Sequence, residues 1–551
     1  MEFRNPSSTP CKEACPVNVD VPSYVRAISQ GKYNAAISII REKLPFPSLC
    51  GRICFHPCED KCNCNNLLDR GPIAISALKR FAAEQGVFKD IPPEQFTGKK
   101  IAVVGSGPAG LTAAYYLRKI GHGVTVFEKL SEPGGMVRYG IPDYRLPKDI
   151  LAHEIQAIEE IGVSIRTNAA IRAPDILLEE GFDAVFVATG AHKNKKLGIP
   201  GEDLPGVLNS ILFMRDLNSG RSMSLGEKVL VVGGGNAAVD VARSALRLGC
   251  KDVVILYRRS REEMPAWSHE VEEAIREGVK IEFLSLPVMI KRKQGRLRVH
   301  CLRTQLGEID EKGRRLPVHV PGSEFIMEAG NIIYAVGQEL ESFKGSRLSV
   351  STRNLIEVDP DCLSTSMAGI FAGGDAVSGP ATVIDAIAAG RKAAVSIDRY
   401  LGGNGEIDLH LPRAEEKILQ SELQGIPVGC RNQAPNLPIV ERLNGFSAVE
   451  LGFNEEQART EASRCLRCDL PIAINAQNCT GCQVCLMRCS LRFSKSFSPR
   501  EAKISIIPYS DGRVNEISFK EGCDTCGICA RYCPQNALCR VAGAEQEGQI
   551  L

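Results

Sequence analysis

The first 85 residues carry apolar side chains at steps of three and four positions, the period of an amphipathic helix. The pattern runs through YVRAISQGKYNAAISIIREKL and returns in IAISALKRFAAEQG. Prolines then interrupt the chain around 91–98. The sequence therefore predicts a small α-helical domain at the N-terminus, followed by a linker.

Two later segments combine short apolar strands with one helical stretch. KKIAVVGSGPAGLTAAYYLRKIGHGVTVFEK and EKVLVVGGGNAAVDVARSALRLGCKDVVILYRR each predict a strand, a glycine turn, a helix and a second strand. This order is typical of a βαβ unit in a parallel sheet. Further strands are expected in FDAVFVATG, NIIYAVGQ and GIFAGGDAV. Their order predicts two Rossmann-like α/β domains, one inserted in the other.

Charge gives little indication of a partner. The charged fraction is 24% and the net charge is +2, so neither nucleic-acid binding nor attraction to a membrane surface is expected. No apolar run approaches the length of a membrane span, and the first residues are polar, unlike a signal peptide. We expect a cytoplasmic protein without membrane insertion.

The cysteines are concentrated at the two ends of the chain. Of the 22 cysteines, seven lie between Cys11 and Cys64 and ten between Cys465 and Cys533. A disulfide framework is the alternative interpretation, but such frameworks belong to small secreted domains. In a large chain of this kind, dense cysteines favour thiolate ligands to metal clusters.

The first glycine turn indicates a dinucleotide site. Gly105, Gly107 and Gly110 follow an apolar strand, and Glu128 ends the next strand. Glycines let the backbone approach a pyrophosphate, the helix N-terminus stabilises its charge, and the acid accepts from ribose hydroxyls. Downstream, GIFAGGDAV precedes a helix, an arrangement that resembles the two-dinucleotide-domain flavoproteins. The predicted FAD-binding residues are Gly105, Gly107, Pro108, Ala109, Gly110, Glu128, Lys129, Gly135, Met136, Arg138, Gly374, Asp375 and Thr382.

The second glycine turn lacks the ribose-binding acid. Its following strand ends at Arg258 and Arg259, and an arginine there can bind a 2′-phosphate through paired hydrogen bonds. This favours NADPH over NADH, although a solvated basic turn is the alternative and leaves NADH open. The predicted nucleotide-binding residues are Gly233, Gly235, Asn236, Ala238, Arg258, Arg259 and Gly337.

The C-terminal cysteines have the spacing of a two-cluster ferredoxin, in which the fourth cysteine of each run binds the other cluster. Zinc is the alternative for paired C-x-x-C motifs, but two runs of four favour 4Fe-4S clusters. One predicted ligand set is Cys479, Cys482, Cys485 and Cys533, and the other is Cys523, Cys526, Cys529 and Cys489.

The N-terminal cysteines and the middle region together resemble the glutamate synthase small subunit family. The resemblance extends through GGMVRYGIPDYRLP and YRRSREEMPAWSHE. The C-x-x-C pair that this family carries near its N-terminus stands here far along the chain, in RCLRC. The resemblance implies one 4Fe-4S cluster on Cys465, Cys468, Cys11 and Cys62, and a second on Cys15, Cys54 and Cys58. For the second, Lys79 occupies the family's Gln or Glu position, so Cys50 or Cys64 is the expected fourth ligand.

These features divide the chain into a multidomain protein. The predicted domains are a helical 4Fe-4S domain (1–95), an FAD-binding domain (96–205 and 336–402), an NAD(P)H-binding domain (206–335), a connector (403–470) and an α+β ferredoxin-like domain with two 4Fe-4S clusters (471–551).

The resemblance implies an NAD(P)H-dependent FAD/iron-sulfur oxidoreductase. Hydride would pass to FAD, and single electrons through up to four clusters, so no catalytic acid, base or nucleophile is expected. Because no further substrate domain is recognisable, we expect an electron-transfer subunit that serves a catalytic partner subunit or soluble ferredoxin. A self-contained NAD(P)H:ferredoxin oxidoreductase, bifurcating or not, is the alternative, and a scaffold with relict cofactor sites is the third interpretation.

Overall fold

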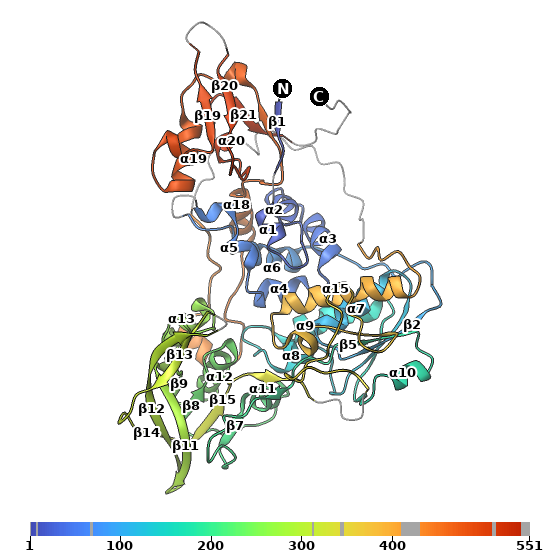
Figure 1. Cartoon of the computed structure of the whole chain (residues 1–551), viewed down its shortest axis with the longest axis vertical. Helices are drawn as coiled ribbons and strands as arrows, with labels where there is room; N and C mark the ends of the chain where they lie inside the picture. Colours follow the sequence, from blue (N-terminus) through green and yellow to red (C-terminus); the bar gives the residue numbers. More distant parts are fainter. Residues whose placement is uncertain are drawn as a thin grey trace. The chain divides into compact units, whose positions relative to one another are not determined.

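The computed structural model describes residues 2–6, 9–66, 70–310, 313–341, 347–408, 430–509 and 514–541 (Figure 1). The chain forms two compact units, each made of segments that are distant in sequence. Unit 1 comprises Met1–Lys89, Asp408–Pro435 and Gly452–Leu551, and unit 2 comprises Asp90–Ile407 and Asn436–Leu451. Part of the predicted connector, 409–429, lies outside the described residues.

Unit 2 contains a first parallel sheet of five strands in the order β17-β5-β2-β3-β4. Its strands are β2 (Lys100–Val104), β3 (Gly123–Phe127), β4 (Ser164–Arg166), β5 (Ala184–Val187) and β17 (Ile370–Ala372). Its helices are α7 (Pro108–Lys119), α8 (Gly135–Tyr139), α9 (Lys148–Glu160), α10 (Ile176–Glu179), α14 (Asp375–Ser378) and α15 (Val383–Tyr400). Because β5 and β17 stand on opposite sides of a long insertion in the sequence, two separate segments build this sheet.

The insertion forms a second parallel sheet, in the order β10-β9-β8-β15-β7. Its strands are β7 (Val207–Asn209), β8 (Lys228–Val232), β9 (Asp252–Leu256), β10 (Lys280–Glu282) and β15 (Asn331–Tyr334). Its helices are α11 (Ser210–Asn218), α12 (Asn236–Arg247) and α13 (Ser268–Arg276). An antiparallel sheet follows, built from β11 (Ser285–Lys293), β12 (Arg296–Ile309), β13 (Arg315–His319) and β14 (Phe325–Ala329). A short ribbon pairs β6 (Lys193–Asn194) with β16 (Gln338–Glu339), and α17 (Ile439–Leu443) also belongs to unit 2.

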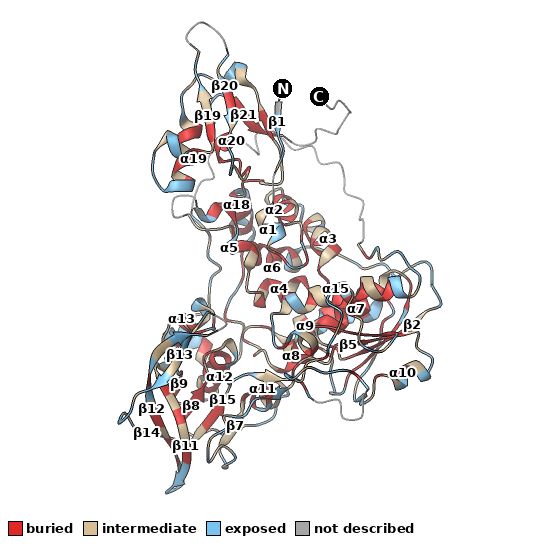
Figure 2. Cartoon of the chain, in the orientation of Figure 1, coloured by how far each residue is buried: buried red, intermediate tan, exposed pale blue. Residues whose placement is uncertain are grey.

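The central strands of the two parallel sheets are buried because they are continuous apolar runs. Figure 2 shows β5 and β8 largely in red, and every residue of β5 is buried. Helices α7 and α15 lie side by side against the first sheet (Figure 1). A Cβ atom at Gly390 of α15 would lie 2.3 Å from the carbonyl oxygen of Ala109, so only glycine permits this close crossing.

Unit 1 begins with the predicted helical domain. Its helices are α1 (Pro10–Glu13), α2 (Val21–Ser29), α3 (Tyr33–Lys43), α4 (Pro47–Ile53), α5 (Pro57–Asp60) and α6 (Ile75–Gln85), with a 3-10 turn at Asn63–Asn66. Helix α18 (Glu455–Ser463) packs against α2 and α6. The helical period therefore gave the correct local structure for this domain.

The C-terminal part of unit 1 is an α+β module. It contains β18 (Ile472–Ile474), α19 (Val484–Ser494), β19 (Ile504–Ile507), β20 (Glu516–Phe519), α20 (Ile528–Arg531) and β21 (Leu538–Arg540), with 3-10 turns at Ala476–Asn478 and Pro499–Glu501. The N-terminal strand β1 (Glu2–Arg4) adds an antiparallel edge to this module, in the order β1-β18-β21 (Figure 1). Since the first and last parts of the chain share one sheet, they belong to one unit.

Candidate functional site

The main candidate site lies at the carboxyl edge of the first parallel sheet, where β2 ends in a glycine turn. Gly105 has φ +104°, and a Cβ atom there would lie 2.5 Å from the carbonyl oxygen of Ala188. Gly107 is the N-cap of α7, and a Cβ atom there would meet no atom within 4 Å. The turn is therefore tight at Gly105 and open at Gly107, so a pyrophosphate can approach the helix N-terminus.

Glu128 is held beside this turn at the end of β3. Its carboxylate accepts hydrogen bonds from the Ser106 backbone N–H (3.1 Å), the Ser106 hydroxyl (2.5 Å) and the Leu130 N–H (2.8 Å). An ionised carboxylate offers about four lone-pair sites. Three of them are used by these hydrogen bonds, which fix the side chain.

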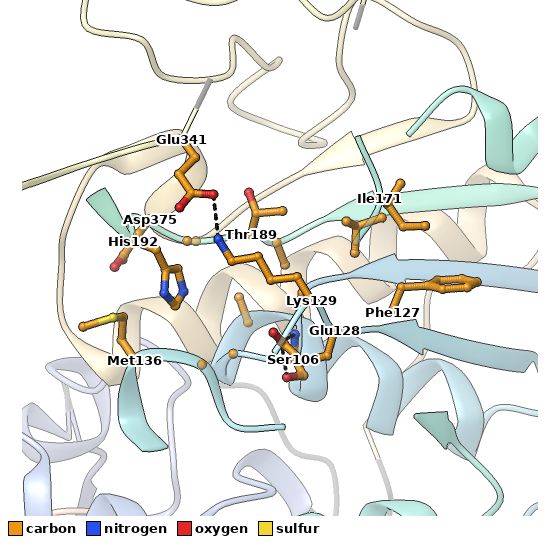
Figure 3. A pocket seen from close by; sticks show the side chains of 18 of the residues that line it. Ser106, Phe127, Glu128, Lys129, Met136, Ile171, Thr189, His192, Glu341 and Asp375 are labelled. Atoms are coloured by element: carbon orange, nitrogen blue, oxygen red, sulfur yellow. Dashed lines mark hydrogen bonds and ion pairs between the residues drawn. The ribbon is translucent and has the colours of Figure 1, made fainter. Parts of the chain in front are cut away.

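These residues line a cavity of about 480 Å³, which lies wholly within unit 2 (Figure 3). This volume is in the range of small-molecule and cofactor sites. The structure brings together in this cavity the predicted residues Gly105, Gly107, Pro108, Ala109, Glu128, Lys129, Gly135, Met136, Gly374 and Asp375. The two sequence segments that were expected to form one site therefore do meet.

Three predicted residues do not line the cavity but support it. A Cβ atom at Gly110 would lie 2.0 Å from the carbonyl oxygen of Gly105, so Gly110 lets α7 pack against the turn. Arg138 donates to the carbonyl oxygen of Pro133 (2.5 Å) and forms an ion pair with Glu132. Thr382 is the N-cap of α15 and forms a capping box with Asp385.

Two of the charged groups on the cavity wall are Lys129, which is paired, and Asp375, which is partly buried, whereas Arg172 is exposed. Lys129 Nζ lies 2.6 Å from the Glu341 carboxylate (Figure 3). Burial alone would raise the pKa of Glu341. The hydrogen bond from Lys129 and its positive charge outweigh this effect, so the pKa of Glu341 is lowered. Burial, together with the charge of Lys129, lowers the pKa of His192, which keeps the imidazole neutral. Burial also raises the pKa of Asp375 to about 6, against the hydrogen bond from the Ala381 N–H (3.2 Å).

Several lining residues were missed by the sequence analysis, among them Ser106, Thr189, His192 and Glu341. A signal for Thr189 was present. The strand FDAVFVATG was predicted, and β5 pairs in parallel with β2, so its carboxyl end reaches the same edge as the glycine turn. For Glu341 no sequence pattern pointed to the cavity.

The second glycine turn occupies the same edge of the second parallel sheet. Gly233 follows β8, and a Cβ atom there would lie 2.4 Å from the carbonyl oxygen of Ala335, which brings the turn close to Gly337. Gly235 is the N-cap of α12, and Ala238 is buried within that helix. The Asn236 side chain accepts a hydrogen bond from the Trp267 N–H (3.0 Å), so it positions the segment that follows β9.

The two predicted arginines face different surroundings. Arg258 is exposed. Its partial desolvation and the positive charge of neighbouring Arg259 lower its pKa. Arg259 is buried, donates to the carbonyl oxygen of Arg315 (2.6 Å) and pairs with Asp310 (3.2 Å). Only Arg258 presents its guanidinium to solvent, where a 2′-phosphate can reach it.

The two sequence stretches that resemble the glutamate synthase small subunit meet inside unit 2. Arg145 of the first stretch pairs with Glu270 of the second (3.1 Å) and with Asp240 of α12 (2.8 Å). All three side chains are largely buried. This network ties the two dinucleotide-binding folds together.

The C-terminal cysteines gather as two groups of the predicted composition. Cys479, Cys482, Cys485 and Cys533 line one small cavity, together with Ile506 and Ile517. Burial, with the charge of Cys523, raises the pKa of Cys489. Burial also raises the pKa of Cys529, with the charges of Cys526, Cys485 and Cys489. Cys533 thus lies with the first three cysteines of the earlier run.

The N-terminal cysteines also form two groups. Burial raises the pKa of Cys11, and the charges of Cys465, Cys62, Cys468 and Cys58 raise it further. The first three of these cysteines are the ones that the resemblance groups with Cys11. Cys64 hydrogen-bonds to Cys62 of this group.

The second N-terminal group surrounds a lysine. Cys15, Cys50, Cys54 and Cys58 act together on Lys79, which points to Cys50 rather than Cys64 as the fourth member.

The donors in these groups are thiols. Among the described residues, no three His, Cys, Asp or Glu side chains are arranged to hold one metal ion. The donor set, four thiols in each group, fits iron-sulfur clusters. Within the described part of the chain, no helix is long and apolar enough to cross a membrane.

Comparison with known proteins identifies the folds. Residues 99–390 match the pyridine nucleotide-disulphide oxidoreductase family, and residues 5–90 match dihydropyrimidine dehydrogenase domain II, 4Fe-4S cluster. The first match confirms a nucleotide-dependent oxidoreductase fold, and the second confirms a 4Fe-4S domain at the N-terminus.

Three curated relatives are similar over most of the chain. The NADP(+)-dependent formate dehydrogenase subunit beta of Moorella thermoacetica is 42% identical over 84% of this chain and 70% of its own length. The NADPH-Fe(3+) oxidoreductase subunit beta of Geobacter sulfurreducens is 39% identical over 85% of this chain and 76% of its own length. The glutamate synthase [NADPH] small chain of Escherichia coli is 32% identical over 71% of this chain and 88% of its own length. The resemblance to the glutamate synthase small subunit is thereby confirmed, and the chain belongs to the pyridine nucleotide-disulphide oxidoreductase family.

Proposed function

We propose that the chain is the NAD(P)H-linked electron-transfer subunit of an oxidoreductase complex. It passes electrons between a nicotinamide nucleotide, FAD and 4Fe-4S clusters, to or from a partner catalytic subunit. The observation that carries this proposal is the 480 Å³ cavity, in which the glycine turn after β2 meets the GGD segment after β17. All three relatives are named as subunits or chains of oxidoreductases, which supports the same role here.

FAD fits the cavity by the chemistry of its walls. The N-terminus of α7 and the open backbone at Gly107 would hold the pyrophosphate, and the remaining lone pair of Glu128 would accept from the ribose. The wall also carries exposed Arg172, whose positive charge suits an anionic cofactor, whereas Lys129 is paired with Glu341. FAD, when bound, supplies the conversion between two-electron hydride transfer and one-electron transfer. The chain's own residues bind and orient, and no residue is assigned an acid–base step.

The nicotinamide nucleotide is proposed to bind at the second glycine turn. Gly233, Gly235 and the N-terminus of α12 would hold its phosphates, and the segment fixed by Asn236 would close over it. Exposed Arg258 would bind the 2′-phosphate of NADPH, whereas buried Arg259 positions the loop through Asp310. This assignment favours NADPH and gives the two arginines separate roles.

Four 4Fe-4S clusters are proposed, two in the helical domain and two in the ferredoxin-like domain, within the domain boundaries predicted from the sequence. Their ligands would be the four cysteine groups described above, with Cys50 completing the second N-terminal group. The Cys468 thiol lies 3.7 Å from the carbonyl oxygen of Cys526, so ligand groups of the two domains adjoin within unit 1. This contact supports electron exchange between the domains, with soluble ferredoxin or a partner subunit as the outer donor or acceptor.

The test is the iron and flavin content of the anaerobically purified protein, with its absorbance change on adding NADPH or NADH. One FAD and about 16 iron atoms per chain, bleached by NADPH, are expected for four clusters. A protein that binds no flavin, or whose clusters stay oxidised after NADPH addition, would contradict the proposal. Ferredoxin turnover at full rate without any partner protein would favour the self-contained oxidoreductase instead.

A further inference from the structure

The segment that follows β9 is attached by its backbone to the second glycine turn. The Ala266 N–H donates to the carbonyl oxygen of Gly234 (3.1 Å), and the Trp267 N–H donates to the Asn236 side chain (3.0 Å). Asn236 is the first residue of α12, at whose N-terminus the nucleotide phosphates are proposed to bind. Trp267 is therefore held, through its main chain, at the edge of the proposed nucleotide site.

The side chain of Trp267 contacts the other dinucleotide fold. The guanidinium carbon of Arg145 lies 5.7 Å from the centroid of the indole ring, close enough for the aromatic face to attract the cation. Arg145 belongs to the fold that is proposed to bind FAD, in the segment between α8 and α9. Its side chain is largely buried and also pairs with Asp240 of α12 and Glu270 of α13. Trp267 thus contacts the nucleotide turn with its backbone and the flavin-binding fold with its ring.

These two contacts of Trp267 can be separated by substitution. Every residue except proline supplies the backbone N–H that the Asn236 side chain accepts. The ring contact needs an aromatic face, which phenylalanine provides in weaker form and leucine lacks. The ion pairs of Arg145 with Asp240 and Glu270 do not involve the ring, so they continue to join the two folds when the ring is removed. Trp267→Leu therefore removes the ring from beneath Arg145 and leaves the hydrogen bond to Asn236 in place.

We propose that Trp267 is a positioning residue for hydride transfer, which aligns the nucleotide turn with the flavin-binding fold through the contact of its ring with Arg145. This inference rests on the proposed function. The step that it serves moves a hydride, which is a proton with an electron pair, from NADPH to FAD and leaves NADP⁺ and reduced flavin. Such a step requires the two reacting atoms to be held about 3–3.5 Å apart, so a small displacement of one fold slows it. The nucleotide phosphates bind at the turn itself, and their binding does not depend on the ring.

The first test uses the fluorescence of Trp267, which is the single tryptophan of the chain. NADP⁺ is titrated into the full-length protein with oxidised FAD, and calorimetry measures binding in parallel. Because the Trp267 N–H is bonded at the N-terminus of α12, we expect the emission to change with the same midpoint as the heat of binding. Binding of NADP⁺ without any change in emission would overturn the inference. Absence of binding would instead refute the proposed nucleotide site, so the two failures are distinguishable.

The second test compares Trp267→Leu and Trp267→Phe in stopped-flow bleaching of the flavin by NADPH. At saturating NADPH, Trp267→Leu should bleach about fivefold more slowly than the wild type, because the cation–π contact is lost. Its dissociation constant for NADP⁺, measured by calorimetry, should stay close to the wild-type value, because the bond to Asn236 remains. Trp267→Phe keeps an aromatic face for Arg145 and should restore most of the rate.

Phe325→Leu is the matched control. The guanidinium carbon of Arg303 lies 4.3 Å from the centroid of the Phe325 ring, but this pair lies within the antiparallel sheet of β12 and β14. Its loss should change neither the bleaching rate nor the affinity for NADP⁺. An unchanged rate in Trp267→Leu would overturn the inference, and so would an equal loss of rate in Trp267→Leu and Trp267→Phe. Loss of FAD or of NADP⁺ binding in both variants would also overturn it, because Trp267 would then serve folding or binding rather than alignment.

Discussion

Asp375 gives the sharpest prediction about the cavity, because its half-buried carboxyl group lies in the cavity wall. Burial, reinforced by the charge of Asp385, raises its pKa from 3.8 to about 6 despite the hydrogen bond from the Ala381 N–H. A carboxyl whose folded-state pKa is raised stabilises the fold only below its unfolded-state pKa. This stability is lost as the pH rises from about 4 through 6. Above pH 6, ionised Asp375 therefore destabilises the flavin-free protein.

Asp375→Asn removes this charge and keeps the acceptor oxygen for Ala381. A shift of about 2 pKa units corresponds to roughly 3 kcal/mol, an upper limit because the side chain is not fully buried. The variant should therefore exceed the wild type in free energy of unfolding by up to about 3 kcal/mol at pH 8, and by only about 1 kcal/mol at pH 4.5. FAD affinity should fall at the same time, since stabilised functional sites commonly lose function.

The assay is urea denaturation of the flavin-free protein at pH 4.5 and pH 8. A chain of two units need not unfold in one step, so the single tryptophan, Trp267, which lies in unit 2, reports the relevant transition. Asp359→Asn is the control: the N–H groups of Asp361 and Cys362 lower the pKa of Asp359, so its replacement should give no gain at pH 8. Equal stability of Asp375→Asn and wild type at both pH values would refute the reasoning.

Two further predictions concern the second dinucleotide fold and its attachment. Arg258→Ala should raise the KM for NADPH about tenfold or more, because it removes a charge-assisted hydrogen bond to the 2′-phosphate that is worth about 1.5–3 kcal/mol. The KM for NADH should stay unchanged, and steady-state kinetics with both nucleotides measures the two effects. Arg259→Ala should instead lower the thermal stability of unit 2, and equal effects of both variants on NADPH would contradict the assignment. Arg145→Met should lower the free energy of unfolding by about 3–5 kcal/mol, because it leaves the buried Asp240 carboxylate without its partner. Adding Asp240→Asn should recover part of that loss, and strict additivity of the two changes would argue against a direct pair.

The sequence predicted best those features that depend on short-range spacing. In the first glycine turn, Gly105 allows the tight turn, Gly107 leaves the backbone open, and Gly110 lets the helix pack closely. The different exposure of Arg258 and Arg259 could not be predicted in this way, because both lie in a bend after β9, where strand alternation does not apply.

Other features depend on contacts that no local pattern encodes. Glu341 lines the cavity and pairs there with Lys129, which is 212 positions away in the sequence. The strand Glu2–Arg4 has three residues, too few to show a period, and its pairing with Ile472–Ile474 is set by the edge that β18 offers. Long-range pairing of this kind can be recognised only once the partner edge is known.

The two cysteine-rich ends of the chain depend on one another, and this limits what a deletion can test. Asn63 donates to the Cys468 thiol (3.2 Å) and accepts from Arg492 of α19 (2.6 Å). Arg531 of α20 donates to the carbonyl oxygen of Cys465 (3.1 Å). Side chains of the C-terminal module thus orient two cysteines of the first N-terminal group.

Removing that module would leave Asn63 and the Cys465 carbonyl without these partners. The loss of these hydrogen bonds would disturb the first N-terminal cysteine group, which the deletion was meant to leave intact. Single cysteine variants avoid this problem. Cys482 is exposed and belongs to the group that lines the small cavity, so its replacement by serine perturbs that group while the contacts of Asn63 and Arg531 stay in place. If electrons leave the chain through the C-terminal module, such a variant should slow transfer to the outer acceptor and leave nucleotide-driven bleaching of the flavin unchanged.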